Sequence, residues 1–445
     1  MNKNKDYLIT EKPSRALFAF ALPMIIGNLF QQAYTIVDSA IVGHYVGETA
    51  LAAVGASYAL TSIFICVAIG GGIGASVIIS QHFGGHAYSR MKTSIRTAML
   101  SFLLISLMLG GIGLCFSRQI MEALNTPADA MDIAVIYLNI YFYGLPFLFM
   151  YNILSSMFNA LGESRIPLYL LIFSSVLNIF LDLYMVATLH LGVAGAAYAT
   201  FIAQGISAVC SFLIFLRTLR RLDGKAETWF SKAEFSSMSR IALPSILQQS
   251  TVSIGMMLVQ SVVNGFGTQI LAGFSASMRI ESLCVVPMSA IGNALSSYTA
   301  QNIGAEKHER IPLGYRAANI MVAITAVILC LFLELLHRPL IALFLDGAPS
   351  AQTVATGEGY LKFIGFFFCM IGFKMAVDGI LRGAGAVKVF TIANLVNLGL
   401  RVLIAKFGAP VYGIAMVWYA VPLGWLANFL ISYGYYRTGK WKQIS

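Results

Sequence analysis

Twelve long apolar segments dominate this sequence and decide what it can fold into. Each is about as long as the ~20-residue helix that crosses a hydrocarbon core of about 30 Å. They occupy residues 16–42, 50–79, 94–117, 132–156, 165–188, 192–216, 237–263, 270–299, 314–337, 354–379, 389–406 and 410–436. Only 11% of the residues are charged, against about 25% in soluble proteins. The sequence therefore predicts an all-α membrane protein with twelve transmembrane helices.

The longest polar stretch divides these segments into two sets of six. It runs over residues 217–236, and it predicts a cytoplasmic linker between an N-terminal lobe of residues 1–216 and a C-terminal lobe of residues 237–445. We do not expect a cleavable signal peptide, because the first fifteen residues are polar and basic and the first apolar segment is too long for the apolar region of one.

The positions of the basic residues predict the orientation in the membrane. If the N-terminus is cytoplasmic, the outer loops contain only Arg118, Arg338 and Lys406, and most of the 29 Lys and Arg fall in inner loops and tails. This is the pattern of the positive-inside rule, so we expect both termini in the cytoplasm. The net charge of +10 is then explained by topology, and nucleic acid is not expected as a partner.

The two sets of helices resemble each other in order and spacing. The matched residues are Ala21-Leu22-Pro23 with Ala242-Leu243-Pro244, Gln81 and Gly84 with Gln301 and Gly304, Gly162 with Gly383, and Gly195 with Gly413. A repeat of six helices crosses the membrane an even number of times, so both copies have the same orientation in it. We therefore expect two six-helix lobes related by a pseudo-two-fold axis along the membrane normal. Such an architecture places a cavity between the lobes.

Two carboxylates at membrane depth are the first candidates for function, because buried charge in a membrane is costly. Asp38 lies late in the first apolar segment and Asp182 late in the fifth. Asn178 lies one turn before Asp182 on the same helix face, and Thr200 on the sixth segment is expected near the same depth. We expect these four residues to converge and couple transport to protons or sodium ions. The alternative is that each aspartate only bonds a neighbouring helix, or that Asp38 reaches the outer interface.

The second half does not repeat the carboxylate pair. Asn397-x3-Arg401 stands where Asn178-x3-Asp182 stands in the first half, and the seventh segment has no acid. Glu281 on the eighth segment is deep enough to contact substrate or ion, and the alternative is a pair with Arg401 or Lys374. Arg279 precedes Glu281 by two residues, so the two do not face each other.

Charged pairs at helical spacing are interpreted as structural. Lys374 with Asp378 and Glu358 with Lys362 are each four residues apart, so they share one helix face and predict ion pairs.

Proline, glutamine and glycine indicate where helices bend or pack closely. Pro23 removes a backbone hydrogen bond from the first segment and predicts a kink, either a static one or one that bends during transport. Gln32 and Gln249 follow the two matched prolines and are expected to line the cleft. The glycines of residues 70–74 lack the strand and the Lys-Ser/Thr of a phosphate loop and predict close helix packing.

These residues together resemble the multidrug and toxic compound extrusion (MATE) family over essentially the whole chain. The resemblance rests on Ala21-Leu22-Pro23, Val37-Asp38, Gln81-x2-Gly84, Asn159-Ala160-Leu161-Gly162-Glu163, Asn178-x3-Asp182, Gln301-Asn302-x-Gly304-Ala305 and Leu381-Arg382-Gly383-x-Gly385. It implies a prokaryotic antiporter of the bacterial inner membrane.

The resemblance also implies roles for single residues. The polar network of the family's first lobe corresponds by position to Asp38, Asn178, Asp182 and Thr200, and positions on the bending helix correspond to Tyr34 and Pro23. The missing acid on the seventh segment favours the proton-coupled, DinF-like branch.

The resulting hypothesis is a monomeric secondary transporter that exports amphipathic, often cationic drugs or toxic metabolites by alternating access. It needs a proton or sodium gradient, contacts membrane lipid, and has no cofactor or metal site, since the six cysteines show no zinc-binding spacing. The alternative is a lipid or oligosaccharide flippase, with Arg279, Lys374 and Arg401 available for anionic headgroups. No HExxH, Gly-x-Ser-x-Gly or paired-aspartate protease motif is present, so we do not expect an enzyme.

Overall fold

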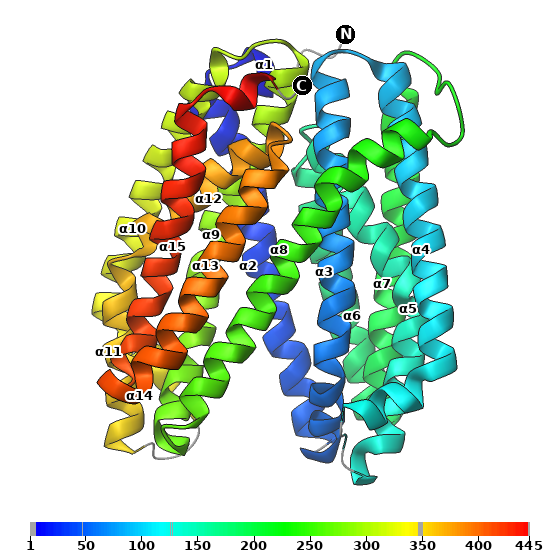
Figure 1. The fold of residues 1–445 in the computed structure, drawn as a ribbon. Helices are drawn as coiled ribbons and strands as arrows, with labels where there is room; N and C mark the ends of the chain where they lie inside the picture. The colour runs from blue at the N-terminus through cyan, green and yellow to red at the C-terminus, as the bar shows by residue number, and fades with distance from the viewer. Residues whose placement is uncertain (1–5, 47, 125, 127, 346–349, 444–445) are drawn as a thin grey trace. The chain divides into compact units, whose positions relative to one another are not determined.

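Helices make up all the regular structure of the described residues (Figure 1). The computed structural model describes residues 6–46, 48–124, 126, 128–345 and 350–443, without the side chains of residues 42, 48–53, 56, 59, 128, 129 and 252. Eleven helices in this part are long and apolar enough to span a membrane, and a helix pair bent by 52° makes a twelfth if it counts as one span. Helices are expected here because every backbone N–H and C=O in hydrocarbon must find its partner within the chain. The predicted all-helical membrane fold is confirmed.

The helices form two compact units, each with its own core. We call residues 26–246 the N unit, and residues 1–25 together with 247–445 the C unit. The N unit contains most of α2 (Pro13–Val46), then α3 (Glu48–Gly84), α4 (Tyr88–Ala123), α5 (Ala128–Ala160), α6 (Arg165–Asp182), the π-helical turn η1 (Leu183–Thr188), α7 (Gly192–Arg220) and the start of α8 (Lys232–Asn264).

The C unit is built from the remaining helices and the first residues of the chain. It contains α1 (Tyr7–Thr10), the start of α2, most of α8, then α9 (Thr268–Gly304), α10 (Arg310–Ala342), α11 (Ala351–Gly365), α12 (Phe368–Gly383), α13 (Val387–Leu403), the π-helical turn η2 (Ile404–Gly408), α14 (Ala409–Tyr412), α15 (Ala415–Arg437) and the 3-10 turn η3 (Lys440–Gln443). The bent pair is α11 and α12, which together cover the predicted span of residues 354–379.

The boundaries of the units fall elsewhere than the predicted lobe boundaries. The sequence predicts a boundary at the linker of residues 217–236, whereas the compact units divide between residues 25 and 26 and between residues 246 and 247. Both divisions lie two residues after a proline inside a helix, Pro23 in α2 and Pro244 in α8. Proline interrupts the backbone hydrogen bonding of a helix, so each division follows a point at which its helix can bend.

Close helix packing in the N unit depends on the glycines of α3. A Cβ on Gly70 would lie 2.5 Å from the backbone nitrogen of Ile246, and one on Gly74 would lie 2.6 Å from the carbonyl oxygen of Met238. A Cβ on Gly72 would lie 2.5 Å from the hydroxyl of Ser156. Hydrophobic burial hardly drives helices together in lipid, so such small residues are what permits close contact. The predicted packing role of this glycine run is confirmed.

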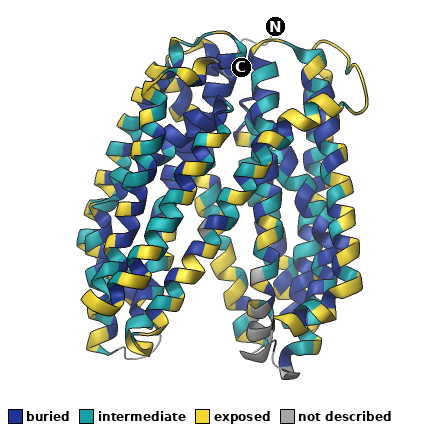
Figure 2. Cartoon of the chain, viewed as in Figure 1, coloured by how far each residue is buried: buried dark blue, intermediate teal, exposed yellow. Residues whose placement is uncertain are grey.

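Each unit buries the helix faces that point to its own interior, and its outer faces remain exposed (Figure 2). The core of the N unit includes Ile79, Phe83, Ile153 and Phe158. The core of the C unit includes Trp441, close to the C-terminus.

Candidate functional site

Five of the predicted residues lie together in the N unit. Tyr34 and Asp38 come from α2, Asn178 and Asp182 from the end of α6, and Thr200 from α7. Asp182 is fully buried and Asn178 is 2% exposed. The helical spacing of four residues on α2 and on α6 points each pair of side chains in one direction.

The amide of Asn178 connects three of the other four residues, Tyr34, Asp182 and Thr200. With its nitrogen turned toward the acid, Asn178 donates to Oδ2 of Asp182 at 2.7 Å and to the hydroxyl of Tyr34 at 2.9 Å. Its oxygen accepts from the backbone nitrogen of Thr200 at 3.1 Å and from the Thr200 hydroxyl at 3.3 Å. This orientation satisfies both ends of the amide, whereas the opposite one would set its oxygen against acceptors.

The carboxyl groups of Asp38 and Asp182 lie within hydrogen-bonding reach of each other. Neither aspartate forms an ion pair with any of the described Lys, Arg or His residues. Oδ1 of each carboxyl is buried without a protein hydrogen-bond partner in the described part of the chain. Two carboxylates in contact repel each other when both are ionised, so one proton or one cation can be held between them.

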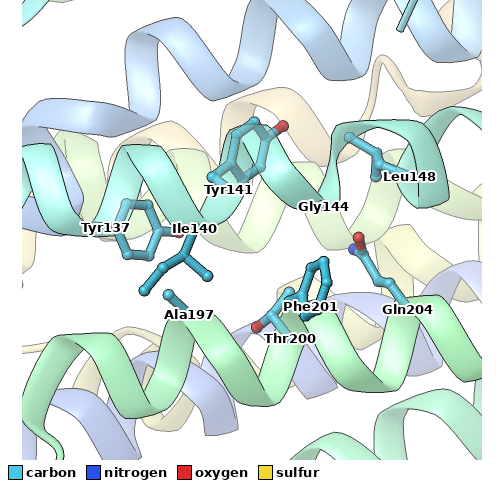
Figure 3. A pocket seen from close by; sticks show the side chains of 9 residues that line it. All are labelled: Tyr137, Ile140, Tyr141, Gly144, Leu148, Ala197, Thr200, Phe201 and Gln204. Atoms are coloured by element: carbon cyan, nitrogen blue, oxygen red, sulfur yellow. The ribbon is translucent and has the colours of Figure 1, made fainter. Parts of the chain in front are cut away.

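Tyr137 on α5 also lies at this site, although nothing in the sequence singles it out. Its hydroxyl lies in electrostatic range of both Asp38 and Asp182. It also lines a pocket between α5 and α7 together with Thr200 (Figure 3). A tyrosine in an apolar helix is ordinary, so the available signal was weak. It consisted of the spacing of Tyr137 and Tyr141, which places both on one face of α5.

Helices α6 and α13 end in the same way. The π-helical turn η1 follows Asp182 directly, and η2 begins three residues after Arg401. The matched motifs Asn178-x3-Asp182 and Asn397-x3-Arg401 therefore both lie shortly before a π-helical turn, one in each unit. Single π turns in helices are often found at functional sites.

Glu281 lies apart from the acidic site, in the C unit. It is 6% exposed, and its Oε2 accepts a hydrogen bond of 2.6 Å from the Tyr360 hydroxyl. Arg401 lies within electrostatic range but forms no ion pair with it in the described residues. Of the two predicted partners, Lys374 is bound elsewhere.

One predicted ion pair is confirmed and the other is wrong. Lys374 pairs with Asp378 at 3.0 Å and donates to Asn394 at 3.1 Å. Glu358 is paired with Arg338 on the neighbouring helix at 3.0 Å rather than with Lys362. The arginine at the end of α10 lies closer to Glu358 than the lysine one turn along its own helix.

The remaining predicted residues are spread over both units. Pro23 is buried inside α2, Gln32 is exposed on α2 in the N unit, and Gln249 is half-buried on α8 in the C unit. Their role in a cleft stays a prediction. In the part of the chain that the structure describes, no group of three or more His, Cys, Asp or Glu side chains could hold a metal ion.

Comparison with known proteins gives one family. The family model described as MatE matches residues 23–184 and 244–406, which correspond to the two halves of the predicted repeat. The probable multidrug resistance protein YpnP of Bacillus subtilis (strain 168) is 30% identical over 432 residues, covering 97% of this chain and 96% of that protein.

Solved structures agree in fold. A MOP superfamily transporter from Pyrococcus furiosus superposes with a TM-score of 0.92 at 22% identity, over 99% of both chains. A multidrug resistance MATE family transporter in an outward-facing conformation gives a TM-score of 0.89 at 22% identity, over 100% of both chains. The predicted resemblance is confirmed: this chain belongs to the MATE family, whose members are transporters and not enzymes.

Proposed function

We propose that this protein is a secondary active multidrug transporter that exports amphipathic, often cationic compounds from the cytoplasm in exchange for protons. It works as a single chain in a bacterial inner membrane, with both termini in the cytoplasm, and an ion gradient takes the place of a cofactor. The observation that carries the proposal is the pair of the fully buried Asp182 and the half-buried Asp38, which has no Lys or Arg partner among the described residues.

The acidic site has the parts that ion exchange needs. When the pair holds one proton fewer, the N unit gains a negative charge that attracts a cationic compound. When the pair takes up a proton from outside, that attraction falls and the compound is released. Exchange follows because proton and compound bind with different affinity in the two states.

The hydrogen bonds around the pair link protonation to helix positions. Asn178 contacts Tyr34 on α2, Asp182 on α6 and Thr200 on α7. A change in the charge of Asp182 therefore alters contacts on three helices at once. Pro23 provides α2 with a point at which it can bend in response.

The relatives support drugs as the substrate class. The Bacillus subtilis relative is named as a probable multidrug resistance protein, and the Staphylococcus aureus relative, 22% identical over 88% of this chain, as a multidrug export protein. The flippase alternative is weaker, because Lys374, one of the three basic residues it relied on, is bound to Asp378.

The test is ethidium transport in proteoliposomes under proton and sodium gradients imposed separately. We expect the wild type to be driven by the proton gradient. Asp38→Asn should reduce export at least tenfold, because the pair then loses one of its two exchangeable carboxyls. Asp132→Asn is the matched control, since that side chain is 81% exposed and pairs with Arg118 at the surface.

Two results would contradict the proposal. Export by Asp38→Asn at the wild-type rate would remove the pair from the mechanism. Export driven by sodium alone would keep the transporter but reject proton coupling.

A further inference from the structure

A polar stripe runs along α7 from the acidic site toward the end of the helix. Thr200, Gln204, Ser207 and Ser211 follow one another at steps of three or four residues, so they share one face of α7. Thr200 belongs to the acidic site, and α7 ends at Arg220, in the region that the charge pattern places in the cytoplasm. The stripe thus points from the carboxyl pair to the cytoplasmic side.

The pocket beside the acidic site follows the first part of this stripe. Tyr137, Tyr141 and Leu148 line it from α5, and Thr200 and Gln204 line it from α7 (Figure 3). On α5 the lining extends over roughly 16 Å along the helix axis. Its cavity volume of about 20 Å³ is room for about one water molecule next to polar groups.

Below the pocket, buried polar atoms continue the line without protein partners. The hydroxyls of Ser207 and Ser211 are fully buried and have no hydrogen-bond partner within the described residues. The buried Oδ1 of Asn159, next to the last residue of α5, has none there either. Phe158 packs on Phe215 with ring centroids 5.0 Å apart, so the end of α5 lies level with the part of α7 that follows Ser211.

Two other buried serines of the N unit, Ser101 and Ser106, satisfy themselves on their own helix. Ser101 donates to the carbonyl of Thr97 at 2.7 Å and Ser106 to that of Leu103 at 2.8 Å. Ser207 and Ser211 make no such bond in the described part of the chain. Buried polar groups without a protein partner are usually bonded to ordered water.

The spacing along the stripe suits water. Successive polar residues of α7 are roughly 4.5–6 Å apart along the axis. One water molecule with two hydrogen bonds of about 2.8 Å bridges such a gap.

The second half of the molecule supplies an internal comparison. At the offset that aligns Gly195 with Gly413, the counterparts of Thr200, Gln204, Ser207 and Ser211 are Trp418, Pro422, Trp425 and Phe429. At the offset that aligns Gly162 with Gly383, the counterpart of Asn159 is Ile380. These positions are therefore apolar in the second half, where the buried polar residues Asn428 and Ser432 of α15 lie elsewhere and Ser432 donates to Asp378 at 2.7 Å.

We propose that α5 and α7 enclose a chain of water molecules that carries protons from Asp38 and Asp182 to the cytoplasm through the interior of the N unit. The inference rests on the proton coupling proposed above and adds the route of release. Protons leave along Thr200, Gln204, Ser207, Ser211 and Asn159, separately from the path of the exported compound.

The double variant Ser207→Ala/Ser211→Ala tests the route in proteoliposomes. Two rates are measured: substrate-driven proton flux with a pH dye in the lumen, and exchange of labelled for unlabelled ethidium at equal pH. We expect the proton flux to fall fivefold or more and the exchange to stay within twofold of the wild type, because exchange needs no net proton release. Ser106→Ala is the matched control, a buried serine of α4 that has its own partner.

The outcomes separate the two proposals. A wild type without proton-coupled flux would overturn the proposed function. A coupled wild type with an unaffected double variant would overturn the water route alone. Equal loss of both rates would also overturn it, since the serines would then serve the transport cycle itself.

Hydroxyl-radical footprinting tests for the water directly and needs no transport. Leu148 lines the pocket, whereas Leu145 on the same helix is buried outside it. We expect radical labelling of Leu148 but not of Leu145, and less labelling of Leu148 in Gln204→Leu. Equal protection of both leucines in the wild type would overturn the water chain.

Discussion

At the scale of single residues, Tyr34 of the acidic site can be tested by removing only its hydroxyl, which lies beside Asn178 and Thr200. Its hydroxyl accepts from Asn178 at 2.9 Å, and a phenylalanine keeps the ring while removing that acceptor. A hydrogen bond of this kind contributes about 0.5–1.5 kcal/mol. We therefore expect Tyr34→Phe to slow proton-driven ethidium export about two- to tenfold, less than Asp38→Asn does. Tyr143→Phe is the control, because Tyr143 lies on α5 and is 63% exposed; a Tyr34→Phe rate equal to that of this control would contradict the role of Tyr34.

At this scale, prediction from sequence succeeded where a residue type was rare in its surroundings. Asp38 and Asp182 stand out in apolar helices, and the four-residue spacing then selected Asn178. Tyr137 could not be found in this way, since tyrosine is common in such helices and only the packing of α5 on α7 brings it to the carboxyls. The failure at Glu358 has a similar cause: Arg338 comes from another helix, and spacing within one helix carries no information about it.

The packing of α3 provides a prediction at the scale of elements. A Cβ on Gly74 would lie 2.6 Å from the carbonyl oxygen of Met238 and 2.7 Å from the nitrogen of Ala242, and backbone atoms cannot move aside easily. Overpacking of this kind costs about 1–3 kcal/mol. We expect Gly74→Ala to lower the yield of monodisperse protein in detergent and its unfolding temperature. Gly111→Ala on α4 should be neutral, because nothing lies within 4 Å of its Cβ position; equal stability of the two variants would show that α3 and α8 are not held this closely.

Helix number and type followed from the sequence because the membrane permits few alternatives. The break between α11 and α12 did not, although it bends the tenth span by 52°. Residues 354–379 contain glycines but no proline, and glycine alone does not tell a bend from close packing. The glycines of α3 also lie in an apolar segment without proline, but they permit close helix packing and not a bend.

For the whole molecule, sequence could not reveal that the first 25 residues belong with the C unit. That assignment depends on contacts between residues almost 300 positions apart. Leu8 and Ile9 are buried there. The carbonyl of Leu8 accepts from Asn302 at 3.1 Å, that of Ile9 from Lys307 at 3.0 Å, and that of Glu11 from Arg310.

These contacts predict that the start of the chain stabilises the C unit and not the N unit. Removing residues 6–11 would take away three acceptors and two buried side chains, each side chain worth about 1.5–3 kcal/mol when fully buried. In the deletion variant we expect faster hydrogen exchange than in the wild type at residues 302–310, measured by mass spectrometry, and unchanged exchange at residues 26–246. Glu11→Gln keeps the backbone acceptor and changes only a surface pair with Arg15, so its exchange should match the wild type. The contrary outcome is an equal increase of hydrogen exchange in both units. Residues 1–25 would then not belong to the C unit alone, and α2 would not pass from one compact unit to the other near Pro23.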